Sequence, residues 1–407
     1  MSIGFAKQLF VNMARIAFTL IGGKSWTGGY NYLLNLLRVI TQHRPGALQP
    51  VLFFGTDVDV GEARPFRAIE GVEIVTSPLM NTARRTSSLL RSLLLGADSA
   101  AKRLFMQNRI DVVFENAQFY GARLGIPVIA WIPDFQHREL PHLFSRIAWW
   151  KRELGFRAQI AGERVIMLSS GDARDACERH YPDTIGRTHL VRFAVPSRGR
   201  PDAALVRSVR EAHGLPERYI YLPNQFWQHK NHLLVVDALA LLKQAGHSIT
   251  VVASGKQLDP YKPDYFEQVV THLISAGVAD QLRLLGLIPY EHVAPLMVGS
   301  VAVLNPSLFE GWSTTVEEAR ALRVPLVLSD IAVHKEQATG LARFFDRTSP
   351  ESLAAALLAV WHGENPLHST NSVPSSSSTD PVQRFADDFV DLVQHVAFRR
   401  HRKSEVI

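Results

Sequence analysis

Cysteine is almost absent from the chain, which has one, Cys177, among 407 residues. One cysteine cannot form an internal disulfide or a cysteine-rich zinc site, so small disulfide-built and zinc-built domains are excluded. Long apolar runs are also lacking. The run at residues 16–21 is far shorter than the roughly 18 to 20 residues needed to span a bilayer, and no small-residue cleavage site follows it. The sequence therefore predicts a soluble protein in a reducing, cytoplasmic compartment.

Apolar residues are plentiful, at 46% of the chain against 20% charged residues. This mixture excludes a disordered, collagen-like or coiled-coil protein. A chain of 407 residues is too long for one ordinary core, so two domains are expected.

Short β-branched and leucine-rich runs alternate with longer helical patterns, which is typical of parallel sheets built from βαβ units. Turn-forming residues interrupt this pattern at 196–201. We predict an α/β protein with two Rossmann-like, doubly wound domains, residues 1–195 and 196–380, that face a central cleft. Residues 381–407 should form a final helix and a basic tail. Strands are expected at 16–21, 51–54, 72–75, 112–114, 128–131, 166–168, 189–192, 219–222, 250–253, 283–285, 301–304 and 325–328.

Positive charge is concentrated in the first half, whose net charge is +8, whereas that of the second half is −2. Residues 81–106 combine leucines with five basic residues, Arg84, Arg85, Arg91, Lys102 and Arg103. This basic amphipathic pattern could lie against anionic headgroups or an anionic substrate. The alternative is a surface helix whose charged face is solvated. We expect no nucleic-acid partner, because no reading motif or interleaved aromatic residues accompany the charge.

The stretch NPSLFEGWSTTVEEARA follows one expected strand and opens a helix. Thr314 and Glu317 have the spacing of a capping box, which predicts the helix start there. Free amides such as that of Thr315, at the positive end of the helix dipole, favour a diphosphate. Glu310 lies in the preceding loop and Glu318 in the second turn, so both carboxylates can reach one ligand.

This pair of glutamates, separated by seven residues, preceded by Pro-Ser and followed by Ala-x-Ala, resembles the signature of the retaining glycosyltransferases of family four. These group 1 glycosyltransferases have the two-domain GT-B fold. A second match is LPNQFWQHKNH, where Lys230 stands at the position of a basic residue that holds the donor diphosphate in the family. The chain departs from the pattern at Gln225, where many relatives have a phosphate-binding arginine.

The first half shows two further matches to the family. Gly28 and Gly29 match a glycine pair that approaches the donor, although a tight turn before a helix at 31–40 explains them equally well. A P-loop is excluded because its first glycine would fall on Phe18. His137 follows a strand and matches a histidine near the sugar, whereas a lone histidine is otherwise a structural residue. In the second half, Leu287 lies in a loop that resembles the one whose backbone reads the nucleotide base.

The resemblance implies a retaining, metal-independent hexosyltransferase with no cofactor, which moves a sugar from a nucleoside-diphosphate sugar to a hydroxyl of a glycan or lipid-linked acceptor. Residues 1–195 would face the acceptor, 196–380 would bind the donor, and the last helix would cross back to the first domain. Surface polysaccharide synthesis, with peripheral contact to the anionic inner membrane, is expected. The implied catalytic residues are Glu310, His137 and Lys230, and the donor-binding residues are Gly28, Gly29, Gln225, Lys230, Leu287, Gly311, Thr314, Thr315 and Glu318.

Several alternatives remain open from the residues alone. Asp57 and Asp59 have the Asp-x-Asp form of a metal–diphosphate motif, although a polar turn is the simpler interpretation. His229 and His232 could suggest a metal, but a third ligand is missing nearby. A nucleotide-sugar hydrolase or epimerase could use the same cleft, and Gln225 would suit a non-catalytic nucleotide-binding relative. The donor nucleotide and sugar are not determined.

Overall fold

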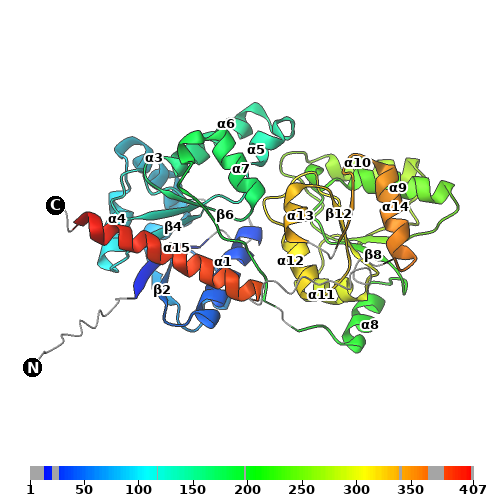
Figure 1. The fold of residues 1–407 in the computed structure, drawn as a ribbon, viewed down its shortest axis with the longest axis horizontal. Coiled ribbons are helices and arrows are strands. Elements are labelled where there is room, and N and C mark those ends of the chain that lie inside the picture. Colours follow the sequence, from blue (N-terminus) through cyan, green and yellow to red (C-terminus); the bar gives the residue numbers. More distant parts are fainter. Residues whose placement is uncertain are drawn as a thin grey trace, which may run out of the picture.

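Two parallel sheets, each covered by helices, lie side by side in the computed structural model (Figure 1). The structure describes residues 13–20, 27–116, 118–196, 199–338, 342–364 and 380–404. Among these residues the first sheet has the strand order β3-β2-β1-β4-β5-β6-β7 and the second the order β10-β9-β8-β11-β12-β13. The predicted α/β architecture of two doubly wound domains is confirmed.

The first domain contains the strands β1 (Ala14–Thr19), β2 (Leu48–Phe54), β3 (Glu73–Thr76), β4 (Val112–Asn116), β5 (Val128–Trp131), β6 (Val165–Leu168) and β7 (Thr188–Leu190). Its helices are α1 (Thr27–His43), α2 (Val60–Arg67), η1 (Pro78–Met80), η2 (Thr82–Arg84), α3 (Arg85–Leu95), α4 (Ser99–Gln107), α5 (Gln136–Glu139), η3 (Pro141–Leu143), α6 (Arg146–Ile160), α7 (Gly171–His180) and η4 (Pro182–Thr184).

The second domain contains the strands β8 (Ile220–Leu222), β9 (Val251–Ala253), β10 (Leu282–Leu284), β11 (Val303–Asn305), β12 (Leu326–Ser329) and β13 (Ala342–Phe345). Its helices are α8 (Ala203–Ala212), η5 (Gln228–Lys230), α9 (His232–Gln244), α10 (Tyr265–Ser275), α11 (Tyr290–Gly299), α12 (Thr314–Ala321), α13 (Ala332–Gln337) and α14 (Pro350–Trp361). The last helix of the chain is α15 (Pro381–Ser404).

The apolar runs of the sequence form strands that are buried within these sheets. All residues of β4, β5 and β6 are buried, as expected for parallel strands with helices on both faces. In the second domain one apolar cluster packs under α9, α10 and α14, and another packs under α11 and α12. The edge strand β13, with sequence ARFF, was not predicted, since it is short and only its last residue is buried.

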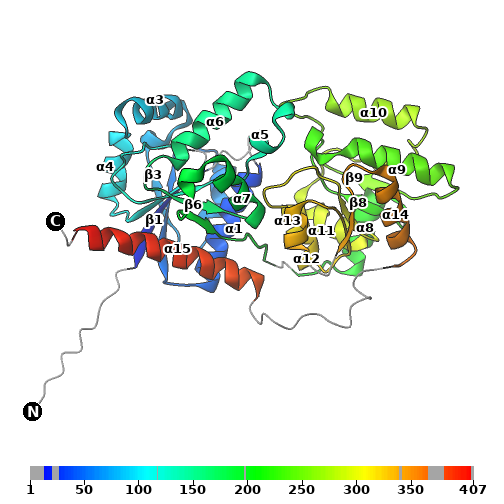
Figure 2. The same cartoon turned by 45° about the horizontal axis from the view of Figure 1, so that its top comes forward.

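The C-terminal helix α15 belongs spatially to the first domain. It packs against α1 and lies over β1 and β4, and Figures 1 and 2 both show it running along this domain. Phe389 is fully buried, with its ring centroid 6.1 Å from that of Phe18 and 5.8 Å from that of Phe114. Phe385 is buried against Phe193 at 5.5 Å. The helix therefore completes the core of the domain that contains the start of the chain.

None of the helices in the described part of the chain is long and apolar enough to cross a membrane.

We expect Phe389→Ala to lower the free energy of unfolding of the first domain by about 3–5 kcal/mol, because it removes a fully buried ring and leaves a cavity. Urea denaturation followed by circular dichroism measures the change. Phe398→Ala, on the same helix but 54% exposed, is the matched control and should change stability little. Equal effects of the two variants would contradict the role of α15 as part of this core.

Candidate active site

Loops that follow strands of the two domains meet at one place. Gly311, in the loop between β11 and α12, lies so close to the first domain that a Cβ atom there would come within 2.0 Å of the Pro133 carbonyl oxygen and 2.9 Å of Asp134 Cβ. Next to it, Trp312 donates from its indole N–H to the Phe193 carbonyl at 2.8 Å. The carboxyl ends of the two sheets therefore face each other, which is where α/β folds place ligands.

Lys230 and Glu310 form an ion pair at this junction. Lys230 ends η5, and its Nζ donates to Glu310 Oε1 at 2.5 Å, with only 13% and 10% of the two side chains exposed. Burial alone would raise the pKa of Glu310, but the charge and hydrogen bond of Lys230, together with the nearby His334 and His229, outweigh it and hold that pKa at about 2. The carboxylate is therefore charged at neutral pH although it is nearly buried.

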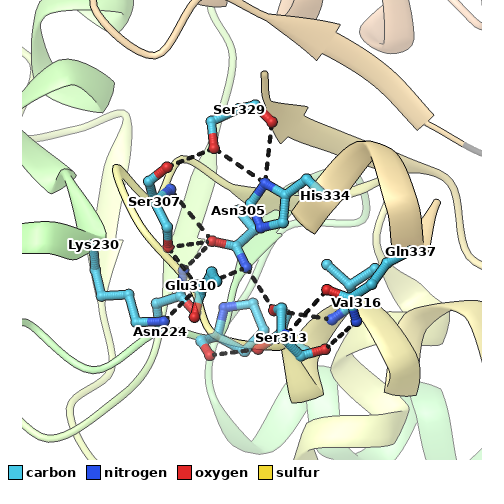
Figure 3. A network of polar contacts seen from close by, with 12 residues as sticks. Asn224, Lys230, Asn305, Ser307, Glu310, Ser313, Val316, Ser329, His334 and Gln337 are labelled. Atoms are coloured by element: carbon cyan, nitrogen blue, oxygen red, sulfur yellow. Dashed lines mark hydrogen bonds and ion pairs between the residues drawn. The ribbon is translucent and has the colours of Figure 1, made fainter. Parts of the chain in front are cut away.

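Asn305, at the end of β11, organises a buried polar network around this pair (Figure 3). Its Nδ2 donates to Ser313 Oγ at 2.9 Å, and its Oδ1 accepts from Asn224 Nδ2 at 3.0 Å. The Ser307 hydroxyl lies 2.6 Å from Asn305 Oδ1 and 2.7 Å from Glu310 Oε1, and its single proton can serve only one of them at a time. Glu310 is thus held from two sides, by Lys230 and by the hydroxyl.

A second layer supports the network from behind. Ser329 Oγ donates to the Ser307 carbonyl at 2.6 Å, and His334 Nδ1 lies 3.1 Å from Ser329 Oγ (Figure 3). Burial lowers the pKa of His334 to about 4, so the imidazole is neutral. These buried contacts keep the loop that carries Glu310 in one position.

The helix start differs from the predicted capping box by one residue. Ser313 rather than Thr314 caps α12, with its Oγ accepting from the Val316 amide at 3.4 Å. Gln337 of α13 fixes Ser313 by donating to its carbonyl and accepting from its amide, both at 3.0 Å, and it also bonds Glu317. Glu317 is therefore held by α13 and does not cap the helix. The first amides of a helix have no acceptor within it, so those of Thr314 and Thr315 remain for a ligand.

Glu318 and Leu287 lie at the edge of α11. Tyr290, the first residue of α11, donates from its hydroxyl to Glu318 Oε1 at 2.8 Å. Tyr290 and Glu318 line a cavity of about 500 Å³, together with Met297 and Leu205. Leu287 is largely exposed, so its side chain is open to a ligand.

Gln225 lies in a loop of the second domain and the glycine pair lies in α1 of the first. The Gln225 side chain accepts from the Lys256 amide at 2.9 Å, so its oxygen ties two loops of the second domain together. Gly28 and Gly29 lie in the first turn of α1, which begins at Thr27 and not at residue 31. The preceding glycine loop lies outside the described residues.

His137, predicted to lie near the sugar, packs among side chains of the first domain. It is completely buried, and its Nε2 lies 3.1 Å from Glu153 Oε2. Three aromatic rings surround it, those of Phe144, Trp149 and Phe156. Burial lowers its pKa, and Glu153 only partly opposes this. His137 comes six residues after Trp131 at the end of β5, which is enough for the side chain to turn into the domain, and the strand-end position alone could not reveal this.

The Asp-x-Asp segment is a polar turn. Asp57 Oδ2 accepts from the Thr82 amide at 2.7 Å, and Asp59 caps α2 through the amides of Gly61 and Glu62. The histidine pair is also structural in part, since His232 is buried and stacked on Phe226. No cluster of three or more potential metal-ligating side chains occurs in the described segments.

Several residues at the junction were not predicted from the sequence. Asn305, Ser307 and Gln337 are uncharged. Their importance comes from the hydrogen bonds by which they position Ser313 and Glu310. Arg152 of α6 pairs with Asp134 and contributes to the lowered pKa of His229 in the second domain, after burial and Lys230. The Asn-Pro-Ser run at the end of a strand is the one sequence signal that could have identified Asn305 and Ser307.

Comparison with known proteins supports this assignment of the fold. Residues 207–372 match the family model described as glycosyl transferases group 1. The second domain is thus similar to the group 1 glycosyl transferases. This match contains Lys230, Glu310 and Glu318.

Solved structures extend the likeness to the GT-B fold of the whole chain. HepE of Anabaena, solved with UDP and glucose, is 14% identical over 97% of this chain and 100% of its own, with a TM-score of 0.62. Sucrose-phosphate synthase from Thermosynechococcus elongatus is 14% identical over 96% and 98%, with a TM-score of 0.62. WaaG, a glycosyltransferase of lipopolysaccharide biosynthesis, is 14% identical over 94% and 99%, also with a TM-score of 0.62. At such identities the likeness concerns the fold.

We expect Gly311→Ala to separate the second domain from the first, because the new Cβ would meet the Pro133 backbone and not a flexible side chain. Small-angle X-ray scattering should show a larger radius of gyration. Gly155→Ala is the control, since nothing lies within 4 Å of a Cβ at that helical position. An unchanged scattering curve for Gly311→Ala would show that the close contact is not maintained in solution.

The Lys230–Glu310 pair should give stability a defined pH dependence. Because the pKa of Glu310 is lowered from 4.5 to about 2, the stabilisation is complete above its ordinary pKa and is lost as the pH falls towards 2. The stability difference between the wild type and Glu310→Gln should therefore shrink by on the order of 3 kcal/mol over this acidic range, measured by urea denaturation. Asp280→Asn, in the exposed pair with Lys243, should shift stability little at any pH.

Proposed function

We propose that this protein is a retaining, metal-independent glycosyltransferase that moves a sugar from a nucleoside diphosphate to a hydroxyl of a glycan or lipid-linked acceptor. The supporting observation is the buried Lys230–Glu310 pair between the start of α12 and the first domain. The group 1 family match and the solved structures of UDP-bound HepE are consistent with this proposal.

The chemical difficulty of the reaction is the departure of a diphosphate while positive charge grows at the anomeric carbon. An ammonium has three protons, so Lys230 can donate to Glu310 and still bind a phosphate oxygen. The amides of Thr314 and Thr315 at the positive end of α12 add to this stabilisation. Groups fixed in position before the reaction stabilise developing charge most effectively.

Glu310 would hold the sugar hydroxyls, and its negative charge would favour the cation-like anomeric carbon. Glu318 would accept hydrogen bonds from the ribose hydroxyls, with Tyr290 orienting its carboxylate. In the proposed same-face route the bond between the anomeric carbon and the phosphate oxygen breaks, and a bond to the acceptor oxygen forms. The acceptor proton passes to the departing phosphate.

The acceptor is proposed from the charge of the first domain. Its excess of basic residues favours an anionic, growing glycan or a lipid-linked one, in surface polysaccharide synthesis on the cytoplasmic side of a membrane. A role for the first domain at the acceptor also agrees with its loops reaching the site at Pro133 and Phe193.

A thermal-shift screen of nucleoside diphosphates and their sugars in EDTA should identify the donor, because a ligand of the folded state raises the melting midpoint. With that donor, Lys230→Ala and Glu310→Gln should each lower turnover by at least ~100-fold through loss of electrostatic stabilisation. Transfer of labelled sugar to a glycan acceptor measures turnover, and circular dichroism checks folding.

The control is Lys243→Ala, which breaks an exposed ion pair in the same domain and should leave turnover unchanged. Near-normal transfer by either site variant would refute the assigned roles. Release of free or altered sugar without an acceptor would instead indicate a hydrolase or an epimerase, and a strict metal requirement would contradict the metal-independent mechanism.

A further inference from the structure

The helix α3 exposes its apolar side chains to solvent, whereas an ordinary surface helix buries them. Its leucines, Leu89, Leu90, Leu93, Leu94 and Leu95, are between 44% and 75% exposed, whereas Ser92 on the same helix is only 1% exposed. Arg85 and Arg91 of the same helix are only half-exposed, so its most solvated side chains include the apolar ones. A row of exposed leucines on one helix is costly in water unless another apolar phase covers it.

The first basic residue of α3 is directed towards the body of the domain. Arg85, at the start of the helix, donates from its guanidinium to the Leu20 carbonyl at 3.4 Å, and Arg91 donates to Ser87 Oγ at 3.2 Å. Leu20 follows β1, so Arg85 lies beside the carboxyl end of an interior strand of the first sheet. The leucines thus point away from the domain while the guanidinium of Arg85 points towards the edge of the sheet where ligands bind.

A second helix at the same edge of the domain also exposes apolar side chains. On α6, Ile147, Trp150 and Leu154 follow one another at intervals of three and four residues and are all more than half exposed. Both views place α3 and α6 at the same edge of the first domain, the upper one (Figures 1 and 2). We call these eight apolar side chains on the two helices the apolar edge.

Positive charge accompanies the apolar edge and exposed negative charge does not. Arg84, Arg146 and Lys151 are exposed on or next to the two helices. Neither helix contains an acidic residue except Glu153, and that carboxylate is fully buried among arginines. Leucine and tryptophan beside exposed cations are the composition of helices that lie in the interface of an anionic bilayer.

We propose that the apolar edge formed by α3 and α6 docks the protein on a membrane that contains anionic lipids, with the leucines inserted among the acyl chains and the cations at the headgroups. A second copy of this chain is a poorer occupant, because its own edge would bring cations against cations with no exposed acid to pair with them. The proposed docking surface would bring the protein to a lipid-linked acceptor, and this link to the acceptor rests on the proposed function. The docking itself does not depend on that function.

Docking can be tested on the full chain without any nucleotide. Co-sedimentation with vesicles of phosphatidylcholine and phosphatidylglycerol, together with the blue shift of tryptophan emission, should show binding that is lost with pure phosphatidylcholine. Leu90→Ser combined with Leu94→Ser should lower the partition coefficient at least about tenfold, because two half-exposed leucines no longer insert. Arg84→Gln combined with Lys151→Gln should lower it by about tenfold at low salt and less at high salt.

Ile274→Ser is the matched control, since Ile274 is 66% exposed on α10 of the other domain and should leave binding unchanged. Equal binding by the leucine variant, or no binding of the wild type to anionic vesicles, would overturn the proposal. So would a dimer in analytical ultracentrifugation that the leucine variant dissociates. Transfer to a soluble acceptor is measured separately: vesicle binding without transfer refutes only the proposed activity, and transfer without vesicle binding refutes only the docking.

Discussion

The structure depends on keeping one ion pair charged where little water reaches it. The desolvation free energy of burying both Lys230 and Glu310 can exceed the free energy gained from their attraction. The presence of such a pair is therefore poor evidence that it stabilises the fold. Its surroundings explain how it is maintained, because Ser307 and Asn305 provide fixed dipoles in place of solvent. A charged lysine and a charged glutamate already in place need little rearrangement when a diphosphate arrives, which is the condition for effective electrostatic catalysis.

The same loop that carries Glu310 also joins the two domains. Gly311 permits the approach of the Pro133 backbone, and Trp312 reaches the Phe193 carbonyl. Beyond this loop, Glu336 of α13 accepts from the Gly171 amide at 2.9 Å and pairs with Arg192. The position of the first domain and the geometry of the second-domain site are therefore coupled through a few residues on either side of one glutamate.

Sequence patterns predicted the elements whose signal is local. The alternation of strands and helices predicted two doubly wound sheets, and the capping-box spacing of Thr314 and Glu317 located the start of α12 to within one residue. These local patterns could not predict whether a side chain is buried or exposed, because tertiary packing decides that. His137 is buried among aromatic rings, whereas the leucines of α3 are exposed. Asn305 and Gln337 were missed since a neutral amide has a role only through partners far away in sequence.

The position of α15 has a consequence for biosynthesis. The domain that leaves the ribosome first lacks part of its core until the last residues of the chain have been made, because Phe18 and Phe114 pack on Phe389. The second domain contains all strands of its own sheet well before that point. Domains usually mature in the order in which they are translated. Here the core of the first domain can close only after the strands of the second have been made, so a nascent chain that stops before α15 would present an open apolar face to chaperones.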